Sequence, residues 1–150
     1  MAVQSPASDG LSKKQYEALS EFRYQLRRFL HFSEVAADRE GITPLQYQLM
    51  LHVRGFPGRN WATVGELAER LQVKPHGAVA LLGRCEAAGL VERRKSLTDR
   101  RQMEVHLLPK GEAILARLAA LHEAELRSLQ GTFQVAHITA FNNAAAPALD

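Results

Sequence analysis

The sequence predicts a mostly helical protein with a small β-ribbon, arranged as a winged helix-turn-helix with flanking helices that form a dimerisation region. Two helical patterns, over 63–71 and 75–88, are separated only by a tight turn. Two alternating segments, over 90–95 and 102–108, follow at once and flank a basic tip. A helix pair followed directly by a β-hairpin is typical of this fold class.

Composition and length limit the classes of protein that fit. The chain has 150 residues, of which 46% are hydrophobic, so we expect one domain with a real core. Its net charge of +3 is too small to indicate a partner by itself. A single cysteine, Cys85, excludes an internal disulfide and fits a reducing compartment. No apolar run approaches the length of a membrane-spanning helix, so no membrane partner is expected.

The start of the chain and its catalytic motifs lead to further expectations. Residues 1–10 have neither the basic nor the apolar region of a signal peptide, and we expect a short disordered tail there. The sequence contains no nucleophile elbow, phosphate-binding loop or His-Glu-x-x-His motif. We therefore predict a cytoplasmic protein that is not an enzyme and has no cofactor.

A long first helix is predicted over 12–39, beginning at a capping box of Ser12 and Gln15 and ending before Gly41. Its apolar side is widened by four aromatic side chains: Phe22, Tyr24, Phe29 and Phe32. A small winged domain does not need so much apolar surface on one helix. We expect part of it to pack against another chain or to frame a cavity, and ordinary core packing stays open for any single aromatic.

The second helix begins with Thr43 as N-cap, Pro44 at its first position and Gln46 reaching back to the cap. Its apolar residues lie nearly all round the helix, so we expect it to be buried. The Gly-Phe-Pro-Gly segment at 55–58 ends it. Residues 59–61 are then expected in a connecting loop.

The helix pair begins with a further capping box, from Thr63 to Glu66, and its second helix has Pro75 at the first position. Gly89 ends that second helix. Its packing side is expected to contain Ala78, Val79, Leu81, Leu82 and Cys85. The side left for a partner is then Lys74, His76, Gly77, Ala80 and Arg84.

A basic block lies at the hairpin. Residues 93–101 carry five positive side chains against one negative side chain, Asp99. A local block of this kind on a hairpin fits a phosphate-binding surface, and the alternative is an ordinary solvated loop. Because the helix pair precedes it directly, we favour double-stranded DNA as the partner.

The last part of the chain is again helical. A long helix is predicted over about 109–130, with Leu118 and His122 on its apolar side, and a further short helix is expected up to Phe141. The chain then forms one domain over 11–150, with the winged helix-turn-helix at about 43–108 and the dimerisation helices at about 12–39 and 109–145.

These residues resemble the multiple-antibiotic-resistance regulator (MarR) family of bacterial transcription factors over about 41–125. The specific segments are Gly41-Ile42-Thr43-Pro44-Leu45-Gln46, Val64-Gly65-Glu66-Leu67-Ala68-Glu69-Arg70-Leu71, Gly89-Leu90-Val91-Glu92-Arg93-Arg94, Asp99-Arg100-Arg101 and Leu108-Pro109-Lys110-Gly111. Each segment is weak alone, and their order and spacing make the resemblance specific. The segment His76-Gly77-Ala78-Val79 is similar to the HHSAV recognition helix of a subset of the family.

The resemblance implies a homodimer in which the first and last helices of two subunits interlock. Two recognition helices would then enter successive major grooves of a pseudo-palindromic operator. Most members of the family repress a nearby promoter and release it when a small ligand, often phenolic or an anionic aromatic, binds between the DNA-binding and dimerisation regions. A repressor released by a small-molecule effector is therefore expected here.

The family pattern also implies roles for the wing. It places Arg101 in the minor groove, braced by a charge-assisted pair with Asp99. Phosphate contacts are expected from the other basic residues, of which strand alternation leaves only some facing the duplex: Arg93, Arg94, Lys95 and Arg100.

The recognition helix offers fewer long donors than is common in the family. Lys74, His76 and Gly77 are positioned for a phosphate or a base edge at the helix N-terminus. Ala80 stands where many members have arginine, and Gly83 where aspartate is usual. Direct base reading is therefore expected to be modest, with more of the recognition carried by the wing tip.

Candidates to line the ligand cavity are His31, Phe32, Tyr47, His52 and Trp61. The six histidines form no dense zinc motif, so no metal site is predicted. Cys85 is expected to be a buried structural thiol, and His122 a hydrogen-bonded interface histidine. A sensor of metal or oxidant on the same scaffold, and a winged helix used for protein contacts, are the alternatives.

Overall fold

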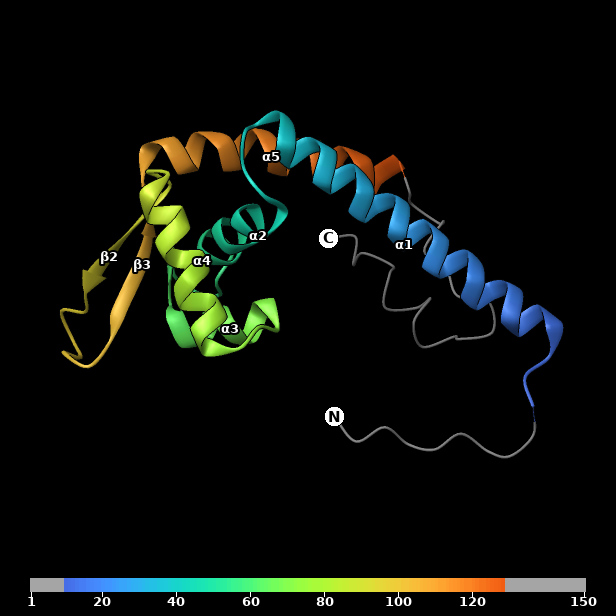
Figure 1. Cartoon of the computed structure of the whole chain (residues 1–150), viewed down its shortest axis with the longest axis horizontal. Coiled ribbons are helices and arrows are strands. Elements are labelled where there is room, and N and C mark those ends of the chain that lie inside the picture. The colour runs from blue at the N-terminus through green and yellow to red at the C-terminus, as the bar shows by residue number, and fades with distance from the viewer. Residues whose placement is uncertain (1–9, 129–150) are drawn as a thin grey trace, which may run out of the picture.

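The structure, a computed structural model, describes residues 10–128. Its elements are α1 (Lys13–Arg39), α2 (Pro44–Arg54), β1 (Trp61–Thr63), α3 (Val64–Leu71), α4 (Pro75–Ala87), β2 (Val91–Lys95), β3 (Met103–Leu107) and α5 (Pro109–Ser128). Figure 1 shows α1 and α5 running side by side, with the other helices and the strands beneath the start of α5. The predicted mostly helical winged helix-turn-helix is confirmed. Apart from Gly10, the expected tail and the short helix ending at Phe141 lie outside the described residues.

Three helices begin with the capping boxes that the sequence predicts. In α1, Ser12 Oγ accepts a hydrogen bond from the Gln15 N–H at 3.3 Å, and Gln15 Oε1 accepts one from the Ser12 N–H at 2.7 Å. The same reciprocal bonds join Thr43 to Gln46 in α2 and Thr63 to Glu66 in α3. The start of α4 differs, because no side chain caps it. A side-chain cap stabilises a helix by about 1 kcal/mol, so α4 lacks that contribution.

The sheet has three antiparallel strands in the order β1-β3-β2, where the sequence predicts a two-stranded ribbon. The placement of Trp61 in a connecting loop is wrong, because Trp61–Thr63 forms β1 and pairs with β3. Gly58 turns the chain with a φ of 76°, and the extended residues before the Thr63 N-cap then meet the free edge of β3. The two strands of the predicted hairpin are confirmed.

The core lies between the sheet and the helices. The sheet contributes Ala62, Val91 and Val105, and the helices contribute large side chains that include Leu49, Met50, Leu67, Leu82 and Leu118. The expectation that α2 is buried all round is wrong, because Leu45 and Leu51 are exposed. The buried face of α2 is a stripe with helical spacing, and these two leucines fall on the opposite side.

The start of α5 packs tightly against the base of the wing. A Cβ atom at Gly111 would lie 2.1 Å from the carbonyl oxygen of Leu90, so this position requires glycine. The Leu108 N–H donates to the same carbonyl at 2.9 Å. Lys110 Nζ donates to the Ala88 carbonyl at 2.8 Å. Together these contacts set the direction in which the wing leaves the helical layer.

Candidate nucleic-acid interface

The outer face of α4 is exposed and carries few long polar side chains. Its exposed residues are Pro75, His76, Val79, Ala80, Gly83, Arg84 and Ala87, with Gly77 half-buried, and the N-cap residue Lys74 is exposed as well. The expectation that Val79 packs inward is wrong, since 47% of this residue is exposed. Ala78, Leu82 and Cys85 already complete the inward face at helical spacing, and Val79 points away from it. The middle of the outer face is therefore apolar and shallow.

The first turn of α4 has backbone N–H groups that no side chain accepts. Lys74 stands at the N-cap position and has no acceptor to offer, and Pro75 has no N–H. Just before it, Gln72 ends α3 in the left-handed region with a φ of 53°. Free N–H groups and the positive end of the helix dipole attract an anion. A phosphate group of DNA has the chemistry to fill this role.

The basic residues of β2 alternate between the two faces of the sheet. Arg93 lies on the face toward α4, where its Nε is 2.8 Å from Glu86 Oε1. Arg94 lies on the outer face, where its Nε is 2.5 Å from Glu92 Oε1. Two of the four expected phosphate contacts therefore have a carboxylate partner within the chain. Among residues 10–128, Lys95 and Arg100 form no such ion pair.

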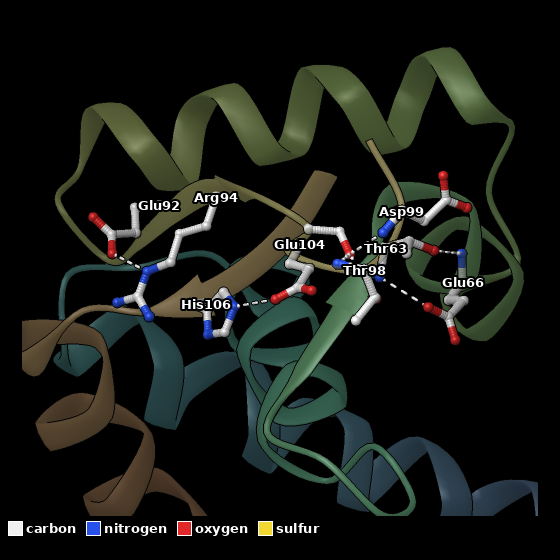
Figure 2. A network of polar contacts seen from close by, with 9 residues as sticks. Thr63, Glu66, Glu92, Arg94, Thr98, Asp99, Glu104 and His106 are labelled. Atoms are coloured by element: carbon white, nitrogen blue, oxygen red, sulfur yellow. Dashed lines mark hydrogen bonds and ion pairs between the residues drawn. The ribbon is translucent and has the colours of Figure 1, made fainter. Parts of the chain in front are cut away.

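The outer face of the wing carries a row of polar and aromatic contacts, part of which Figure 2 shows. His106 Nε2 lies 2.9 Å from Glu104 Oε1, next to the Glu92–Arg94 pair. The ring of Trp61 stacks on His106, with centroids 6.4 Å apart. The sequence prediction placed Trp61 at a ligand cavity, whereas the structure places it on this sheet face. The stack links β1 to β3 and stiffens the wing at its base.

Arg59 continues this row toward α3. Its guanidinium lies 3.8 Å from the Trp61 ring centroid and 4.2 Å from that of Phe56, and it forms an ion pair with Glu66. Burial raises the pKa of the Glu66 carboxyl, but the hydrogen bonds from Thr63 and the nearby Arg59 outweigh burial and hold the pKa below its ordinary value. Glu66 is thus ionised at neutral pH and joins the connecting loop to the N-terminus of α3.

The tip of the wing is organised by its own side chains. Ser96 is buried, and its Oγ accepts hydrogen bonds from the N–H groups of Thr98 and Asp99. Asp99 Oδ1 accepts the Arg101 N–H at 3.0 Å. Asp99 therefore braces Arg101 through its backbone, and within the described residues no ion pair joins the carboxylate to the guanidinium. Sequence reasoning missed Ser96, although a serine three residues before an aspartate at the end of a strand is a recognisable turn signal.

The predicted ligand-lining residues do not come together in one cavity. His31 and Phe32 line a cavity of about 740 Å³ between α1 and α5, whose wall also contains Arg27, Arg28 and Arg39. Tyr47, His52 and Trp61 are not among its lining residues. His52 is half-buried, and burial together with the charge of Arg70 lowers its pKa.

Tyr47 instead packs on His122. The two rings stack with centroids 4.5 Å apart, and the edge of Phe32 meets the same histidine at 5.5 Å. His122 Nδ1 lies 2.6 Å from the Leu118 carbonyl oxygen, and its Nε2 lies 2.8 Å from Ser33 Oγ. Because a carbonyl can only accept, Nδ1 carries a proton. The expectation of a hydrogen-bonded histidine is confirmed, with both partners in the same chain, and its place at an interface stays a prediction.

Two further predictions concern reactive or metal-binding groups. Cys85 is fully buried, and burial raises the pKa of its thiol to about 11. A thiol in this state is a poor nucleophile and a poor redox sensor. In the part of the chain that the structure describes, no three histidine, cysteine or acidic side chains are grouped to hold a metal ion. Over the same residues, no helix is long and apolar enough to cross a membrane.

The uncapped recognition helix and the basic, braced wing define a DNA-binding regulator of the winged helix-turn-helix class. A model of the MarR family matches residues 40–102. The chain is 30% identical over 115 residues to the HTH-type transcriptional repressor MdtR of Bacillus subtilis (strain 168), covering 69% of this chain and 68% of that protein. It is 29% identical over 119 residues to a putative transcriptional regulatory protein for the hcr operon of Thauera aromatica, covering 75% of this chain and 70% of that protein.

Solved structures agree with these relatives. The crystal structure of a MarR family transcription regulator superposes with a TM-score of 0.68 at 29% identity, covering 86% of this chain and 83% of that one. AbsC of Streptomyces coelicolor has the same fold, with a TM-score of 0.70 at 21% identity over 93% of this chain and 95% of that one. The chain belongs to the MarR family of DNA-binding transcriptional regulators. The similarity of His76–Val79 to the HHSAV subset stays a prediction.

Proposed function

We propose that this regulator is a homodimeric repressor that binds a pseudo-palindromic operator and is released by a small anionic aromatic ligand. One observation carries the proposal. The uncapped N-terminus of α4 and the basic tip of the wing lie on the same side of the molecule, away from α1 and α5 (Figure 1). A helix N-terminus and a basic hairpin on one side fit the major groove and an adjacent minor groove of one duplex.

The residues of this interface are expected to contribute unequally. Arg101, Arg100 and Lys95 are the best candidates for DNA contacts, because they are exposed and, among the described residues, their side chains form no ion pair with a carboxylate. Arg93 must first break its ion pair with Glu86, and Arg94 its pair with Glu92. This cost lowers the net binding free energy that each arginine gains from a phosphate. On α4, Lys74, His76, Gly77 and Arg84 are the candidates, and Ala80 permits close approach of the helix to the groove.

The homodimer is supported by exposed apolar side chains on the helical layer. They are Tyr16, Leu19, Tyr24 and Leu30 on α1, and Leu121 and Leu126 on α5. Large apolar groups gathered on two neighbouring helices mark a surface that packs against a partner. A two-fold dimer buries the same surface on both copies and presents two interfaces to a pseudo-palindromic site. Repression is supported by the printed name of the relative MdtR, a transcriptional repressor.

The effector class is inferred from the cavity between α1 and α5. Phe32, Val35 and Leu121 give it apolar walls, and Arg27, Arg28 and Arg39 supply positive charge. The wall also holds two carboxylates, Glu125 and Glu40, of which Glu40 is paired with Arg117, so the arginines are in excess. An aromatic carboxylate matches both features, since arginine binds carboxylates in a bidentate manner. Phe32 also contacts His122, on which Tyr47 of α2 stacks. A ligand that displaces Phe32 therefore disturbs its contact with His122, and through His122 the packing of α2, which belongs to the winged helix-turn-helix.

DNA binding and the dimer are tested on the purified full chain. A duplex is selected by the protein from a random pool, and its affinity is measured by fluorescence anisotropy at increasing salt. We expect salt-sensitive binding with a stoichiometry of one dimer per site, and sedimentation equilibrium should give twice the chain mass. A monomer at micromolar concentration, or binding that salt does not change, would contradict the proposal.

The effector class is tested by thermal unfolding with benzoate as the probe. A ligand at 100 times its dissociation constant should add about 2.7 kcal/mol to stability. Arg28→Gln should reduce this gain, because the variant loses a cavity charge. Toluene, which has the ring without the carboxylate, is the matched control ligand. An equal effect of benzoate on wild type and Arg28→Gln contradicts the proposed mode of binding.

A further inference from the structure

The far end of the wing carries an apolar side chain among positive charges. Leu97 is fully exposed, with a relative exposure of 102%. Lys95, Arg100 and Arg101 are exposed near it in the sequence. Single exposed leucines are common on protein surfaces and need no explanation by themselves. The conformation of the tip and the chemistry around it decide whether this leucine has a role.

The tip holds Leu97 in one conformation. Ser96, directly before it, is only 6% exposed. The Oγ of Ser96 accepts the N–H of Thr98 at 3.3 Å and the N–H of Asp99 at 3.1 Å. Leu97 therefore lies fully exposed within a hydrogen-bonded turn, and its backbone loses little conformational entropy when a partner covers the side chain.

The returning end of the tip is closed in a similar way. The Ser96 N–H donates to the Gln102 carbonyl, and the Gln102 N–H donates to the Asp99 carbonyl, both at 3.1 Å. Asp99 Oδ1 accepts the Arg101 N–H at 3.0 Å. Leu97 and Arg101 thus belong to one hydrogen-bonded loop, closed by Ser96 and Gln102.

The charge around Leu97 indicates the chemistry of that partner. Lys95, Arg100 and Arg101 are exposed in the same loop and form no ion pair among the described residues, so a protein that buried this leucine would meet positive charge beside it. A DNA minor groove has walls of apolar deoxyribose C–H groups between two rows of phosphates. Proteins that bind this groove often insert apolar side chains into it beside arginines. An apolar tip inside a ring of positive charge matches this arrangement.

We propose that Leu97 is an apolar DNA contact that enters the minor groove together with Arg101. The proposal rests on the proposed function, because it requires the wing to bind DNA. Leu97 packs against the sugar walls, and Arg101 supplies the charge that holds the tip in the groove. Such a contact favours a narrow minor groove, as in A-tracts, where the sugar walls lie close together, and adds sequence preference without a hydrogen bond to a base.

The test uses the full chain and the selected duplex, with affinity measured over a range of salt. Leu97→Ala should weaken binding about five- to twentyfold while its salt slope stays that of wild type, because a leucine releases no counterion. Leu97→Met keeps the apolar volume and should bind within about twofold of wild type. Arg101→Ala should instead lower the salt slope by about one. Equal midpoints of thermal unfolding serve as the control for folding.

A second variant tests the role of the turn. In Ser96→Ala the tip is no longer fixed, and the additional loss from Leu97→Ala should shrink to about threefold or less. Wild-type affinity in Leu97→Ala overturns the proposal, and so does a loss in Leu97→Met as large as that in Leu97→Ala. Failure of the proposed function is distinct, because wild type itself would then show no salt-sensitive binding to any duplex.

Discussion

The tip of the wing and the first turn of α4 lie on the same side of the molecule, but their backbone N–H groups are satisfied in opposite ways. In the tip, Ser96 and Asp99 accept three of these groups. In α4, no side chain accepts any of them, although α1, α2 and α3 all begin with complete capping boxes. The tip is therefore preorganised in the free protein, whereas the first N–H groups of α4 remain available to an acceptor from another molecule.

This difference has an energetic consequence. A prebuilt tip loses little conformational entropy on binding, so most of the interaction of Arg101 with DNA appears as affinity. The start of α4 forgoes a cap of about 1 kcal/mol in the free protein. A phosphate bound there supplies the missing acceptor. The wing is therefore expected to dominate recognition, and α4 to act mainly in positioning.

The largest effect is expected from Arg101→Ala. The variant should lose about 1–3 kcal/mol of binding free energy, because a cation in the minor groove is lost, and its salt slope should fall by about one. Anisotropy titrations of the selected duplex measure both quantities. Arg94→Ala is the matched control, since Arg94 is paired with Glu92 on the outer face. Equal losses in the two variants would contradict a special role for the tip.

Ser96→Ala should have the next largest effect after Arg101→Ala and Leu97→Ala. Removing the hydroxyl leaves the Thr98 and Asp99 N–H groups without their acceptor and frees the tip, so DNA affinity should fall by about 0.5–1.5 kcal/mol. Because Ser96 acts through the residues it positions, the loss should not add to that of Arg101→Ala. Ser96→Thr keeps the hydroxyl and should restore most of the affinity. Full additivity in the double-mutant cycle would show that Ser96 does not act through Arg101.

Lys74→Ser is expected to have a smaller effect, and to change stability and DNA affinity in opposite directions relative to Lys74→Ala. A serine can cap α4 and should raise the free energy of unfolding by about 0.5–1 kcal/mol relative to Lys74→Ala, as measured by urea denaturation. Both variants lose the same charge. If DNA uses the free N–H groups of the first turn, the serine competes with it, and Lys74→Ser should bind more weakly than Lys74→Ala. Tighter DNA binding by Lys74→Ser would exclude this use of the helix N-terminus.

The smallest effect is expected from His76→Ala. His76 is exposed and lies on the shallow outer face of α4, so its removal should change the DNA affinity by no more than about 0.5 kcal/mol. A loss comparable with that of Arg101→Ala would mean that the helix, rather than the wing, dominates recognition.

Local signals in the sequence were sufficient to predict most of the helices and the hairpin. The capping boxes at Ser12, Thr43 and Thr63 involve residues three apart, so they can be read without knowing the fold. β1 was missed because its extended state depends on pairing with β3, which lies far along the chain. Val79 was misplaced because α4 is apolar on more than one side, and only packing decides which side faces inward.

The candidate site was predictable to a lesser extent. The basic block of the wing was evident, but which of its arginines are paired depends on Glu86 in α4 and on the pleat of β2. The ligand candidates were chosen from helices whose relative placement the sequence does not specify. Only His31 and Phe32 lie at the cavity, and Trp61 serves the sheet instead.

Hydroxyl-radical footprinting of the selected duplex with wild type and Arg101→Ala tests most directly whether the wing carries recognition. The radical attacks deoxyribose from the minor groove, where we place the tip, and methylation of guanine N7 probes the major groove, where we place α4. At saturating protein, wild type should protect the minor groove at two symmetric outer positions. Arg101→Ala should lose this protection and keep the methylation footprint. Retained minor-groove protection in Arg101→Ala would contradict the account.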